Sequence, residues 1–347
     1  MEKTMKAVVK KHPNVGAELV DIPIPKIDPH EVLIRVKATA VCGTDVHIFN
    51  WNAWAQNANI TLPVTLGHEF CGEVVEVGAN VNGLSIGDIV SGETHIPCGT
   101  CYQCMNGEQH ICANLTIFGV HTDGCFAEYT KIPAICARKL PSTIPAKYGA
   151  ILEPLGTSIR ACTEAQVGGK NVAVIGCGAI GLFAVSAAAA LGAKTVIAVD
   201  VFDEKLEVAK QVGSTHPVNS MTVDATKTIL ELTDGVGVDV IIEASGHPGA
   251  IVQGFKYLRK GGEVMLIGLP STPVPLDFGS DIVFKEAKIK GIHGREMFKT
   301  WLIMENLIAS KKMNIDPIIT HQMALDKFDY AFELLKGNTG IKIVLIP

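Results

Sequence analysis

The chain has 347 residues, of which 48% are hydrophobic and 19% are charged, and its formal net charge is -5. This length exceeds what one ordinary hydrophobic core holds, so we expect two domains. Acidic and basic residues are interspersed, which argues against the clustered basic surface of a nucleic-acid-binding protein. The longest small apolar run, residues 184–193, is too short to span a membrane, and the N-terminus lacks the apolar core of a signal peptide. We therefore expect a cytoplasmic protein with neither a nucleic acid nor a membrane as partner.

The first 150 residues predict an irregular, mostly antiparallel β domain. Short runs of apolar and β-branched residues are separated there by proline, glycine and asparagine. The expected strands are residues 6–10, 31–39, 73–77 and 88–91. Few stretches in this part have the period and length of a helix.

The pattern changes near residue 150, where nearly continuous apolar runs begin to alternate with helix-like segments. The expected strands are residues 171–175, 195–199, 238–243 and 263–267, and the expected helices include 181–191 and 203–212. Continuous apolar strands are typical of a sheet that helices cover on both faces. Strand–helix alternation therefore predicts an α/β unit with a parallel, doubly wound sheet. Towards the end of the chain, amphipathic helices are expected at 301–309 and 328–336, and a closing strand at 341–346.

A glycine-rich turn, GCGAIG, lies between the first of these apolar strands and an alanine-rich helix. In this context the first glycine makes a tight turn, the second admits a pyrophosphate, and the third allows close packing of helix and strand. The sequence therefore predicts a dinucleotide site, to which we assign Gly176, Gly178, Ile180 and Gly181.

Asp200 closes the next expected strand. A carboxylate there accepts hydrogen bonds from an adenosine ribose and repels a 2′-phosphate, which favours NAD over NADP. The alternative is an aspartate that caps the following helix, and Lys205 lies near enough to leave NADP open. Further on, Ile267, Gly268 and Leu269 stand at another strand end, where the nicotinamide ribose could pass.

Four cysteines are closely spaced as C-x₂-C-x₂-C-x₇-C, at Cys98, Cys101, Cys104 and Cys112. Four thiolates complete a tetrahedral zinc site without an open position, which is the signature of a structural metal. An iron–sulfur cluster is the alternative, since three cysteines at this spacing also occur in ferredoxins. The nicotinamide-type fold without a flavin motif favours zinc.

Cys42, His68 and Glu69 form a second candidate metal site, in VCGTDVH and LGHEF. A catalytic zinc has fewer protein ligands and keeps one position for water or substrate, and thiolate, imidazole and carboxylate suit it, although cobalt or iron could also bind. Taken singly, Cys42 would be read as a buried small hydrophobe and His68 as a core histidine. Glu153, in LEPLG, could complete the coordination or simply begin a helix.

These motifs together resemble the zinc-containing medium-chain dehydrogenases. GHEFCGEVVEVG, the four-cysteine segment and VIGCGAIG carry the resemblance, which runs the whole length of the chain. Longer segments resemble, within that family, the branch of the L-threonine 3-dehydrogenases. These segments are CGTDVHIFNWNAWAQ (42–56), GETHIPCG (92–99), GIHGREMFKTW (291–301) and PIITH (317–321).

The resemblance implies a GroES-like catalytic domain, residues 1–155 and 300–347, with a structural zinc lobe near 93–115. Residues 156–299 would form a Rossmann domain that binds NAD. It also implies two zinc ions per chain and a homotetramer. Carried onto matching positions, Thr44 and His47 form a proton relay and Glu153 adjusts the catalytic zinc. The implied activity is oxidation of a secondary hydroxyl of a small molecule, in that branch L-threonine to 2-amino-3-oxobutanoate.

The sequence departs from the threonine enzymes after Glu153, where EPLGTSIR stands in place of their EPLGNAVH. Arg160 could bind an anionic group of the substrate, or contact the cofactor or a helix neighbour. His95 could contact the substrate or make a local hydrogen bond, and we assign Ile292 and His293 to the cofactor site.

The sequence is also compatible with two other functions. The first is a related dehydrogenase that oxidises a polyol, a diol or an anionic hydroxy compound. The second is a zinc-free quinone-reductase relative or a non-catalytic scaffold, a class expected to lack Cys42, His68 or the four-cysteine segment, all of which are present here.

Overall fold

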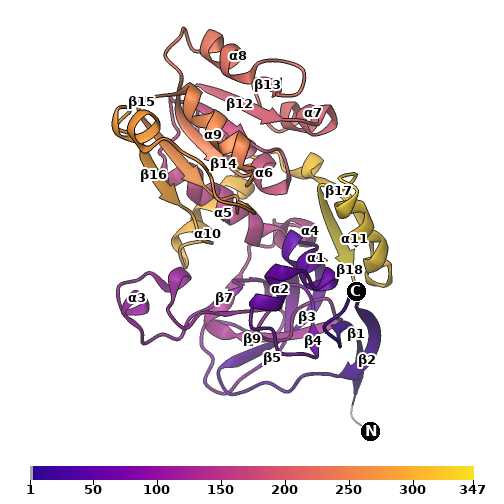
Figure 1. Ribbon diagram of the computed structural model, residues 1–347. Coiled ribbons are helices and arrows are strands. Elements are labelled where there is room, and N and C mark those ends of the chain that lie inside the picture. The colour runs from indigo at the N-terminus through magenta and orange to yellow at the C-terminus, as the bar shows by residue number, and fades with distance from the viewer. Residues whose placement is uncertain (1–2) are drawn as a thin grey trace. The chain divides into compact units, whose positions relative to one another are not determined.

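The computed structural model describes residues 3–347, and the chain divides into two compact units (Figure 1). The first unit runs to Glu153 and is completed by Ile319–Pro347, and the second is Pro154–Ile318. The domain boundaries expected near residues 155 and 300 stay a prediction. Within the described residues, no helix combines the length and the apolar character needed to cross a membrane.

A seven-stranded sheet forms the centre of the first unit, in the order β10–β6–β5–β3–β18–β17, and β9 also pairs with β3. Its strands are β3 (Glu31–Ala40), β5 (Glu69–Val77), β6 (Ile89–Gly92), β9 (Tyr129–Pro133), β10 (Ala137–Lys139), β17 (Ile319–Ala324) and β18 (Lys342–Ile346). All of its pairings are antiparallel except the one between β17 and β18. The expectation of a mostly antiparallel β domain is therefore confirmed.

Two smaller sheets complete the β structure of this unit. One has the order β2–β1–β4 and the other pairs β7 with β8. Their strands are β1 (Thr4–Lys10), β2 (Glu18–Pro23), β4 (Val64–Thr65), β7 (His95–Ile96) and β8 (Thr116–Ile117).

The helices of the first unit are mostly short, and the sequence pattern did not single out the first four. They are α1 (Gly43–Asn50), α2 (Ala53–Asn57), α3 (Tyr102–Met105), α4 (Ala146–Gly149) and α11 (Phe328–Lys336). The unit also has 3₁₀ turns at η1 (Gln109–Ile111), η2 (Ala134–Cys136) and η5 (Leu325–Lys327). Helices this short gain most of their stability from tertiary packing and caps rather than from apolar periodicity. The Asn52 side chain, for example, caps α2 by accepting from the backbone N–H groups of Trp54 and Ala55.

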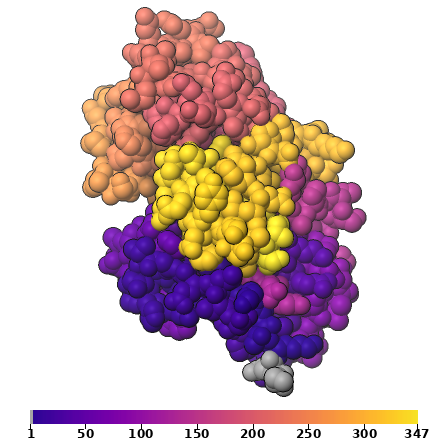
Figure 2. Space-filling model, turned by 90° about the vertical axis from the view of Figure 1, so that its right-hand side faces the viewer, coloured from indigo at the N-terminus to yellow at the C-terminus, as the bar shows by residue number. Residues whose placement is uncertain are grey.

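The C-terminal segment returns to pack on the N-terminal part of the same unit. Phe332 of α11 lies with its ring centroid 4.7 Å from that of Phe49 in α1 and 6.4 Å from that of Phe126. In Figure 2 the yellow C-terminal residues accordingly lie against the indigo N-terminal ones. This packing brings β18 to the strand that leads into α1.

The second unit contains a six-stranded parallel sheet in the order β13–β12–β11–β14–β15–β16. Its strands are β11 (Asn171–Ile175), β12 (Thr195–Asp200), β13 (His216–Asn219), β14 (Val238–Glu243), β15 (Leu258–Leu266) and β16 (Lys288–Gly291). The strand order reverses between β11 and β14, which is where sheets of this topology bind ligands at their carboxyl edge.

Helices α6 and α7 pack together, as do α8 and α9, and each pair packs against the sheet (Figure 1). The helices of this unit are α5 (Leu152–Glu164, which begins in the first unit), α6 (Ala179–Ala190), α7 (Asp203–Gln211), α8 (Ala225–Leu232), α9 (Pro248–Tyr257) and α10 (Lys299–Ala309). A π-helix, η3 (Phe278–Val283), and a 3₁₀ turn, η4 (Asp316–Ile318), complete the unit. The expected parallel, doubly wound α/β sheet is confirmed.

Candidate active site

The four closely spaced cysteines converge on one point. The sulfur atoms of Cys98, Cys101, Cys104 and Cys112 all lie within 4.8 Å of one another. Backbone N–H groups donate to them, including those of Cys98 and Asn114 to the Cys112 sulfur at 3.3 Å each. The segment folds so because α3 and η1 are single turns that wind it around the sulfurs. Four convergent sulfurs fit a closed, tetrahedral structural zinc.

The same backbone geometry favours the thiolate form of the exposed member of this cluster. The backbone N–H groups of Thr100 and Cys101, with smaller effects from the side chains of Asn114 and Thr100, lower the pKa of Cys98 to about 5. A thiolate is the form of cysteine that binds a metal. In the same lobe, burial raises the pKa of Cys104 to about 12, so the backbone favours the thiolate at Cys98 and not at every member of the cluster.

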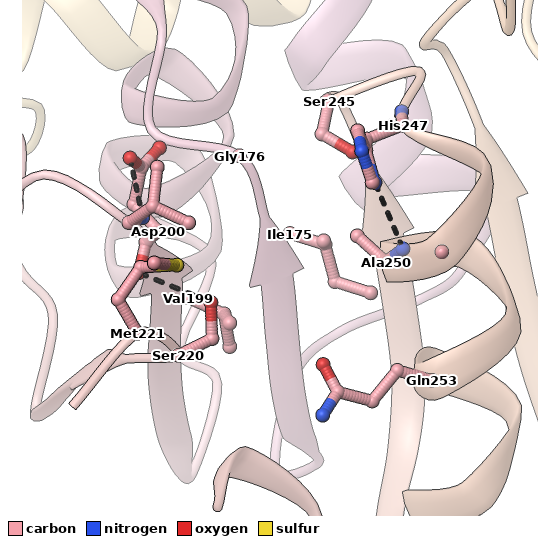
Figure 3. A pocket seen from close by; sticks show the side chains of 12 residues that line it. Ile175, Gly176, Val199, Asp200, Ser220, Met221, Ser245, His247, Ala250 and Gln253 are labelled. Atoms are coloured by element: carbon pink, nitrogen blue, oxygen red, sulfur yellow. Dashed lines mark hydrogen bonds between the residues drawn. The ribbon is translucent and has the colours of Figure 1, made fainter. Parts of the chain in front are cut away.

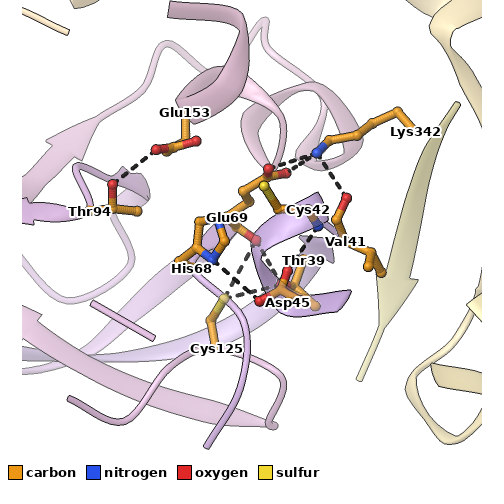
Figure 4. A network of polar contacts seen from close by, with 10 residues as sticks. All are labelled: Thr39, Val41, Cys42, Asp45, His68, Glu69, Thr94, Cys125, Glu153 and Lys342. Atoms are coloured by element: carbon orange, nitrogen blue, oxygen red, sulfur yellow. Dashed lines mark hydrogen bonds and ion pairs between the residues drawn. The ribbon is translucent and has the colours of Figure 1, made fainter. Parts of the chain in front are cut away.

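The second predicted set also comes together, in the first unit. One donor atom from each of Cys42, His68 and Glu69 lies within 4.8 Å of the others (Figure 4). His68 and Glu69 are buried, while Cys42 is partly exposed at the N-cap of α1. A sulfur, an imidazole nitrogen and a carboxylate oxygen at this spacing, three donors in all, fit a zinc that keeps a free position.

Asp45 supports two members of this set. Its Oδ2 accepts from the backbone N–H of Cys42 at 2.8 Å, and its Oδ1 lies 3.3 Å from Nδ1 of His68. Burial lowers the pKa of His68, but the negative charges of Asp45 and Cys42 outweigh it and hold that pKa well above its usual value. The pocket thus gathers negative charge around His68, as expected of a cation site.

Lys342 from β18 pairs with Glu69. Its Nζ lies 2.7 Å from Oε1 and 2.6 Å from Oε2, and it also donates to the carbonyl of Val41 (Figure 4). Burial lowers the pKa of Lys342, and the attraction of Glu69 outweighs that effect and raises the pKa above its usual value. Burial also raises the pKa of Glu69, to about 7, against the opposing charge of Lys342. The hydrogen bond from Lys342 to Oε1 and the short ion-pair distance to Oε2 restrain the orientation of the Glu69 carboxylate.

Among the described residues, the donor atoms that converge at the second metal site belong to Cys42, His68 and Glu69, and Glu153 does not contribute one. Its Oε1 accepts from the hydroxyl of Thr94 at 2.9 Å (Figure 4). Its role in adjusting the metal site stays a prediction.

Thr44 and His47 lie one turn apart on α1, so they share a face of that helix. Nδ1 of His47 lies 2.7 Å from Nδ2 of Asn52. The Asn52 amide is oriented by its carbonyl oxygen, which accepts from two backbone N–H groups, so its NH₂ group faces the imidazole and donates. The neutral His47 ring consequently carries its proton on Nε2.

The second unit holds a pocket of about 460 Å³ at the carboxyl edge of its sheet (Figure 3). Asp200, Ser220 and Met221 form one side, and Ser245, His247 and Gln253 form the other. Its lining residues are Ile175, Gly176, Val199, Asp200, Val201, Ser220, Met221, Ser245, His247, Gly249, Ala250 and Gln253. Of the predicted cofactor residues, Gly176 and Asp200 line this pocket.

The first and the third glycine of the motif stand at positions where a side chain would not fit. Gly176 adopts φ +88°, and a Cβ on Gly181 would lie 1.7 Å from the carbonyl oxygen of Gly176. Gly178 is the N-cap of α6, and the backbone carbonyl of Ile180 accepts from Ser158. Only glycine therefore fits at the turn and at the helix contact.

The carboxylate of Asp200 accepts hydrogen bonds from two backbone segments, the glycine-rich turn after β11 and the residues that follow β12. Its Oδ2 accepts from the N–H of Cys177 at 2.6 Å, and its Oδ1 accepts from those of Val201 and Phe202 at 2.7 and 3.0 Å. These bonds end on residues that precede α7, whose N-cap is Phe202 without a side-chain cap, so Asp200 does not cap the following helix, and it lines the pocket. Lys205 places its Nζ 4.7 Å from the ring centroid of Phe202.

The other predicted cofactor residues lie at loops beyond β15 and β16. The backbone N–H groups of Ile267 and Gly268 donate to the carbonyl of Glu243, and Leu269 is 84% exposed. Ile292 is buried and donates to the carbonyl of Leu266.

Arg160 is buried, and its guanidinium donates to the backbone carbonyls of His293, at 2.9 Å, and Gly294. Thr157, which stands where the threonine enzymes have an asparagine, accepts from buried Arg295 at 3.5 Å. Both residues therefore contact the segment after β16, and the helix-neighbour alternative for Arg160 is met by Glu164 of the same helix, whose Oε1 lies 3.6 Å from Nε of Arg160. Its contact with a substrate stays a prediction.

His95 is buried in β7, and its backbone N–H and its Nδ1 lie 3.1 and 3.2 Å from Oε1 of Glu93. This is the local hydrogen bond foreseen as the alternative to a substrate contact, and the substrate role stays a prediction.

Comparisons with known proteins place this architecture in a family. Residues 28–142 match the alcohol dehydrogenase GroES-like domain, and residues 179–334 match the zinc-binding dehydrogenase domain. The chain therefore belongs to the zinc-binding, medium-chain alcohol dehydrogenases, an oxidoreductase family. The predicted GroES-like and Rossmann folds are confirmed.

Individual relatives are similar over the full length of the chain. The L-threonine 3-dehydrogenase of Bacillus licheniformis is 47% identical, and the match covers 100% of both proteins. A zinc-binding dehydrogenase of Sinorhizobium meliloti, solved with NADP, is 32% identical with a TM-score of 0.92 and full coverage of both chains. Galactitol-1-phosphate dehydrogenase of Escherichia coli is 30% identical with a TM-score of 0.91, covering 99% of this chain and 100% of its own.

Proposed function

We propose that the chain is a zinc-dependent, NAD-linked dehydrogenase that oxidises the C3 hydroxyl of L-threonine. The reaction converts L-threonine and NAD⁺ into 2-amino-3-oxobutanoate, NADH and a proton. The observation that carries the chemistry is the convergence of Cys42, His68 and Glu69. The substrate is supported by the 47% identity with a threonine dehydrogenase, against 30% with the galactitol-1-phosphate enzyme.

Two zinc ions per chain fit the two donor sets, and we assign the four-cysteine lobe to a structural ion and Cys42, His68 and Glu69 to a catalytic one. Bound there, zinc supplies a Lewis acid that lowers the pKa of a substrate hydroxyl. Asp45 orients the imidazole of His68 so that Nε2 is free to coordinate, as carboxylates do for metal-bound histidines. The positive charge of Lys342 offsets the negative charge of Glu69. It thereby reduces the net negative charge of the three donor residues Cys42, His68 and Glu69.

Thr44 and His47 are proposed to handle the proton that leaves the substrate hydroxyl. Both lie on α1, whose N-cap is Cys42, so the helix that carries the thiolate ligand also positions the proton acceptors. In the neutral His47 ring Nδ1 is the nitrogen without a proton, so His47 takes up the proton there, and the Asn52 NH₂ group that donates to Nδ1 turns away when it does. An imidazole is suited to this role because its ordinary pKa lies near neutrality.

NAD is the proposed cofactor because a carboxylate, Asp200, faces the pocket where an adenosine ribose would lie. The nicotinamide ring, when bound, supplies the hydride acceptor. The relative solved with NADP keeps the choice of cofactor within this proposal. A cytoplasmic location and a homotetramer, with a small molecule as substrate, complete it. None of the ten cysteines, all of which lie among the described residues, forms a disulfide.

Initial-rate measurements with a substrate panel test the proposal. NAD and NADP are each combined with L-threonine, 2,3-butanediol, sorbitol and galactitol 1-phosphate, and Cys42→Ser serves as the inactive control. The proposal expects the highest kcat/KM for L-threonine with NAD. A clearly higher kcat/KM for a polyol or its phosphate would assign the site to the alternative class of substrate.

A further inference from the structure

The strongest feature that the proposed chemistry leaves unused is a buried carboxylate at the edge of the second unit's sheet. Glu243 ends β14 and its side chain is completely buried. Burying a carboxylate is costly unless hydrogen bonds replace its water. A hydrophobic residue would fill the end of a central strand at lower cost, so the bonds that Glu243 makes need an explanation.

The carboxylate of Glu243 is held by the turn that follows its own strand. Its Oε1 accepts from the backbone N–H groups of Ser245, at 2.8 Å, and Gly246, at 3.0 Å, and from the hydroxyl of Ser245. All three donors are neutral groups, and the Glu243 side chain only accepts from them. Accepting without donating is what the ionised form of a carboxyl group does. Charge-assisted bonds of this kind are stronger than neutral ones.

A short chain of hydrogen bonds extends from Glu243 to the start of α9. The Ser245 hydroxyl that donates to Glu243 accepts in turn from the backbone N–H of His247 at 3.1 Å. His247 is the N-cap of α9, and its Nδ1 accepts from the N–H of Ala250 at 3.3 Å (Figure 3). Ser245, His247 and Ala250 all line the pocket. The turn at Ser245 and the start of α9 form one wall of the pocket. Hydrogen bonds that begin at the buried carboxylate of Glu243 hold this wall in place.

The same turn is closely packed against the other loops of this edge. A Cβ on Gly176 would lie 2.8 Å from the backbone of Ser245, and a Cβ on Gly268 would lie 2.5 Å from Oε2 of Glu243 and 2.3 Å from the nitrogen of Gly246. The backbone carbonyl of Glu243 accepts from Ile267 and Gly268. A shift of the turn would consequently disturb both the glycine motif and the loop after β15.

We propose that Glu243 is a positioning residue of the nucleotide site: through Ser245 it sets the turn and the start of α9 that form one wall of the pocket, and thereby determines affinity for the dinucleotide. This inference rests on the proposed assignment of the pocket to NAD. Glu243 touches no substrate or cofactor atom itself. Its effect is on the dissociation constant of the nucleotide rather than on the chemical step.

The test is NADH binding, measured by fluorescence titration of the zinc-loaded enzyme, together with the melting temperature of each variant. Glu243→Gln keeps the shape, but when its amide oxygen takes the place of Oε1 its NH₂ group faces the N–H of Gly246, which lies 3.3 Å from Oε2 in the wild type, so it should raise the Kd for NADH on the order of tenfold or more. Ser245→Ala removes the link to His247 while leaving the backbone donors, so it should raise the Kd by a smaller factor. Asp239→Asn is the matched control, because Asp239 lies at the other end of β14 and bonds Arg259 and the N–H of Asn171.

The outcomes separate a positioning role from a purely structural one. The inference expects a raised Kd in Glu243→Gln and Ser245→Ala at a temperature where all variants are folded, and an unchanged Kd in Asp239→Asn. A lowered melting temperature with unchanged Kd in both pocket-side variants would overturn it. If Glu243→Gln does not fold, Ser245→Ala decides alone. Failure of the wild-type enzyme to bind NADH would instead overturn the proposed function.

Discussion

Lys342 of β18 and Glu69 of β5 lie 2.6 Å apart in the interior of the first unit, although 273 residues separate them in the chain. These two residues are brought together by β3, which lies between β5 and β18 in the sheet. Ala40 of β3 pairs with Glu69 on one side and with Val344 on the other. The C-terminal strand β18 thus places the ammonium group of Lys342 beside Glu69, a proposed metal ligand. The site is therefore built from both the N-terminal part and the C-terminal segment of the chain.

Replacing Lys342 by methionine should destabilise the fold by about 3–5 kcal/mol, because it leaves the buried carboxylate of Glu69 without its partner. The free energy of unfolding from denaturant titration of the zinc-free protein measures this effect. Lys342→Arg is the control, since it keeps the charge and should retain most of the stability. Equal stability of Lys342→Met and the wild type would show that the pair is not ionic in solution.

The two metal sites should separate by substitution. Cys42→Ser should lose one zinc per chain, keep its melting temperature near that of the wild type, and lose about a thousandfold or more in kcat/KM. Cys101→Ser should also lose one zinc but should melt at a lower temperature, because a structural zinc contributes folding free energy. Elemental analysis and calorimetry give both readings. Full activity of Cys42→Ser would contradict the catalytic assignment.

Removal of zinc should expose a thiol that reacts already in mildly acidic solution. The pKa of Cys98 is about 5 in the metal-free lobe, so its thiolate fraction, and hence its alkylation rate, should stay nearly constant between about pH 6 and pH 8. An ordinary thiol would react faster with each step up in pH. Cys71 and Cys136 should stay unlabelled, because burial raises the pKa of each to about 12. Peptide mapping after chelation and iodoacetamide treatment measures the three rates; labelling of Cys98 that rises steeply over this range would contradict the account of the lobe.

The cofactor preference should depend on the charge of Asp200. Asp200→Ser removes the carboxylate that opposes a 2′-phosphate, so the ratio of kcat/KM with NAD to that with NADP should fall by at least about tenfold. Asp203→Ser is a suitable control, because Asp203 begins α7 nearby but does not line the pocket. An unchanged ratio in Asp200→Ser would place the cofactor selectivity elsewhere.

Local sequence signals predicted part of this site because some ligand sets are contiguous. Cys98 to Cys112 are close in the chain, and the single turns α3 and η1 gather them without long-range contacts. The apolar strands β11 and β14 were predicted at their observed bounds, since continuous burial on both faces leaves an unambiguous pattern.

The remaining parts depend on contacts between segments that the sequence separates. Nothing around Lys342 indicates a partner in β5, because strand order decides that pairing. Asp45 stands three residues after Cys42, the spacing of a capping box, and that signal could have identified it. Met221 and His247 line the pocket only because the strands before them end at the same edge of the sheet. The short helix α1 was not predicted because it lacks a marked apolar period.

Diffraction at the zinc absorption edge tests the central claim most directly. Crystals of the zinc-loaded wild type should show two anomalous peaks per chain, one among Cys98, Cys101, Cys104 and Cys112 and one in contact with Cys42 and His68 beside Glu69. A peak at the four cysteines alone, with the thiol and imidazole of the second set turned away from each other, would contradict the account of a zinc-dependent dehydrogenase.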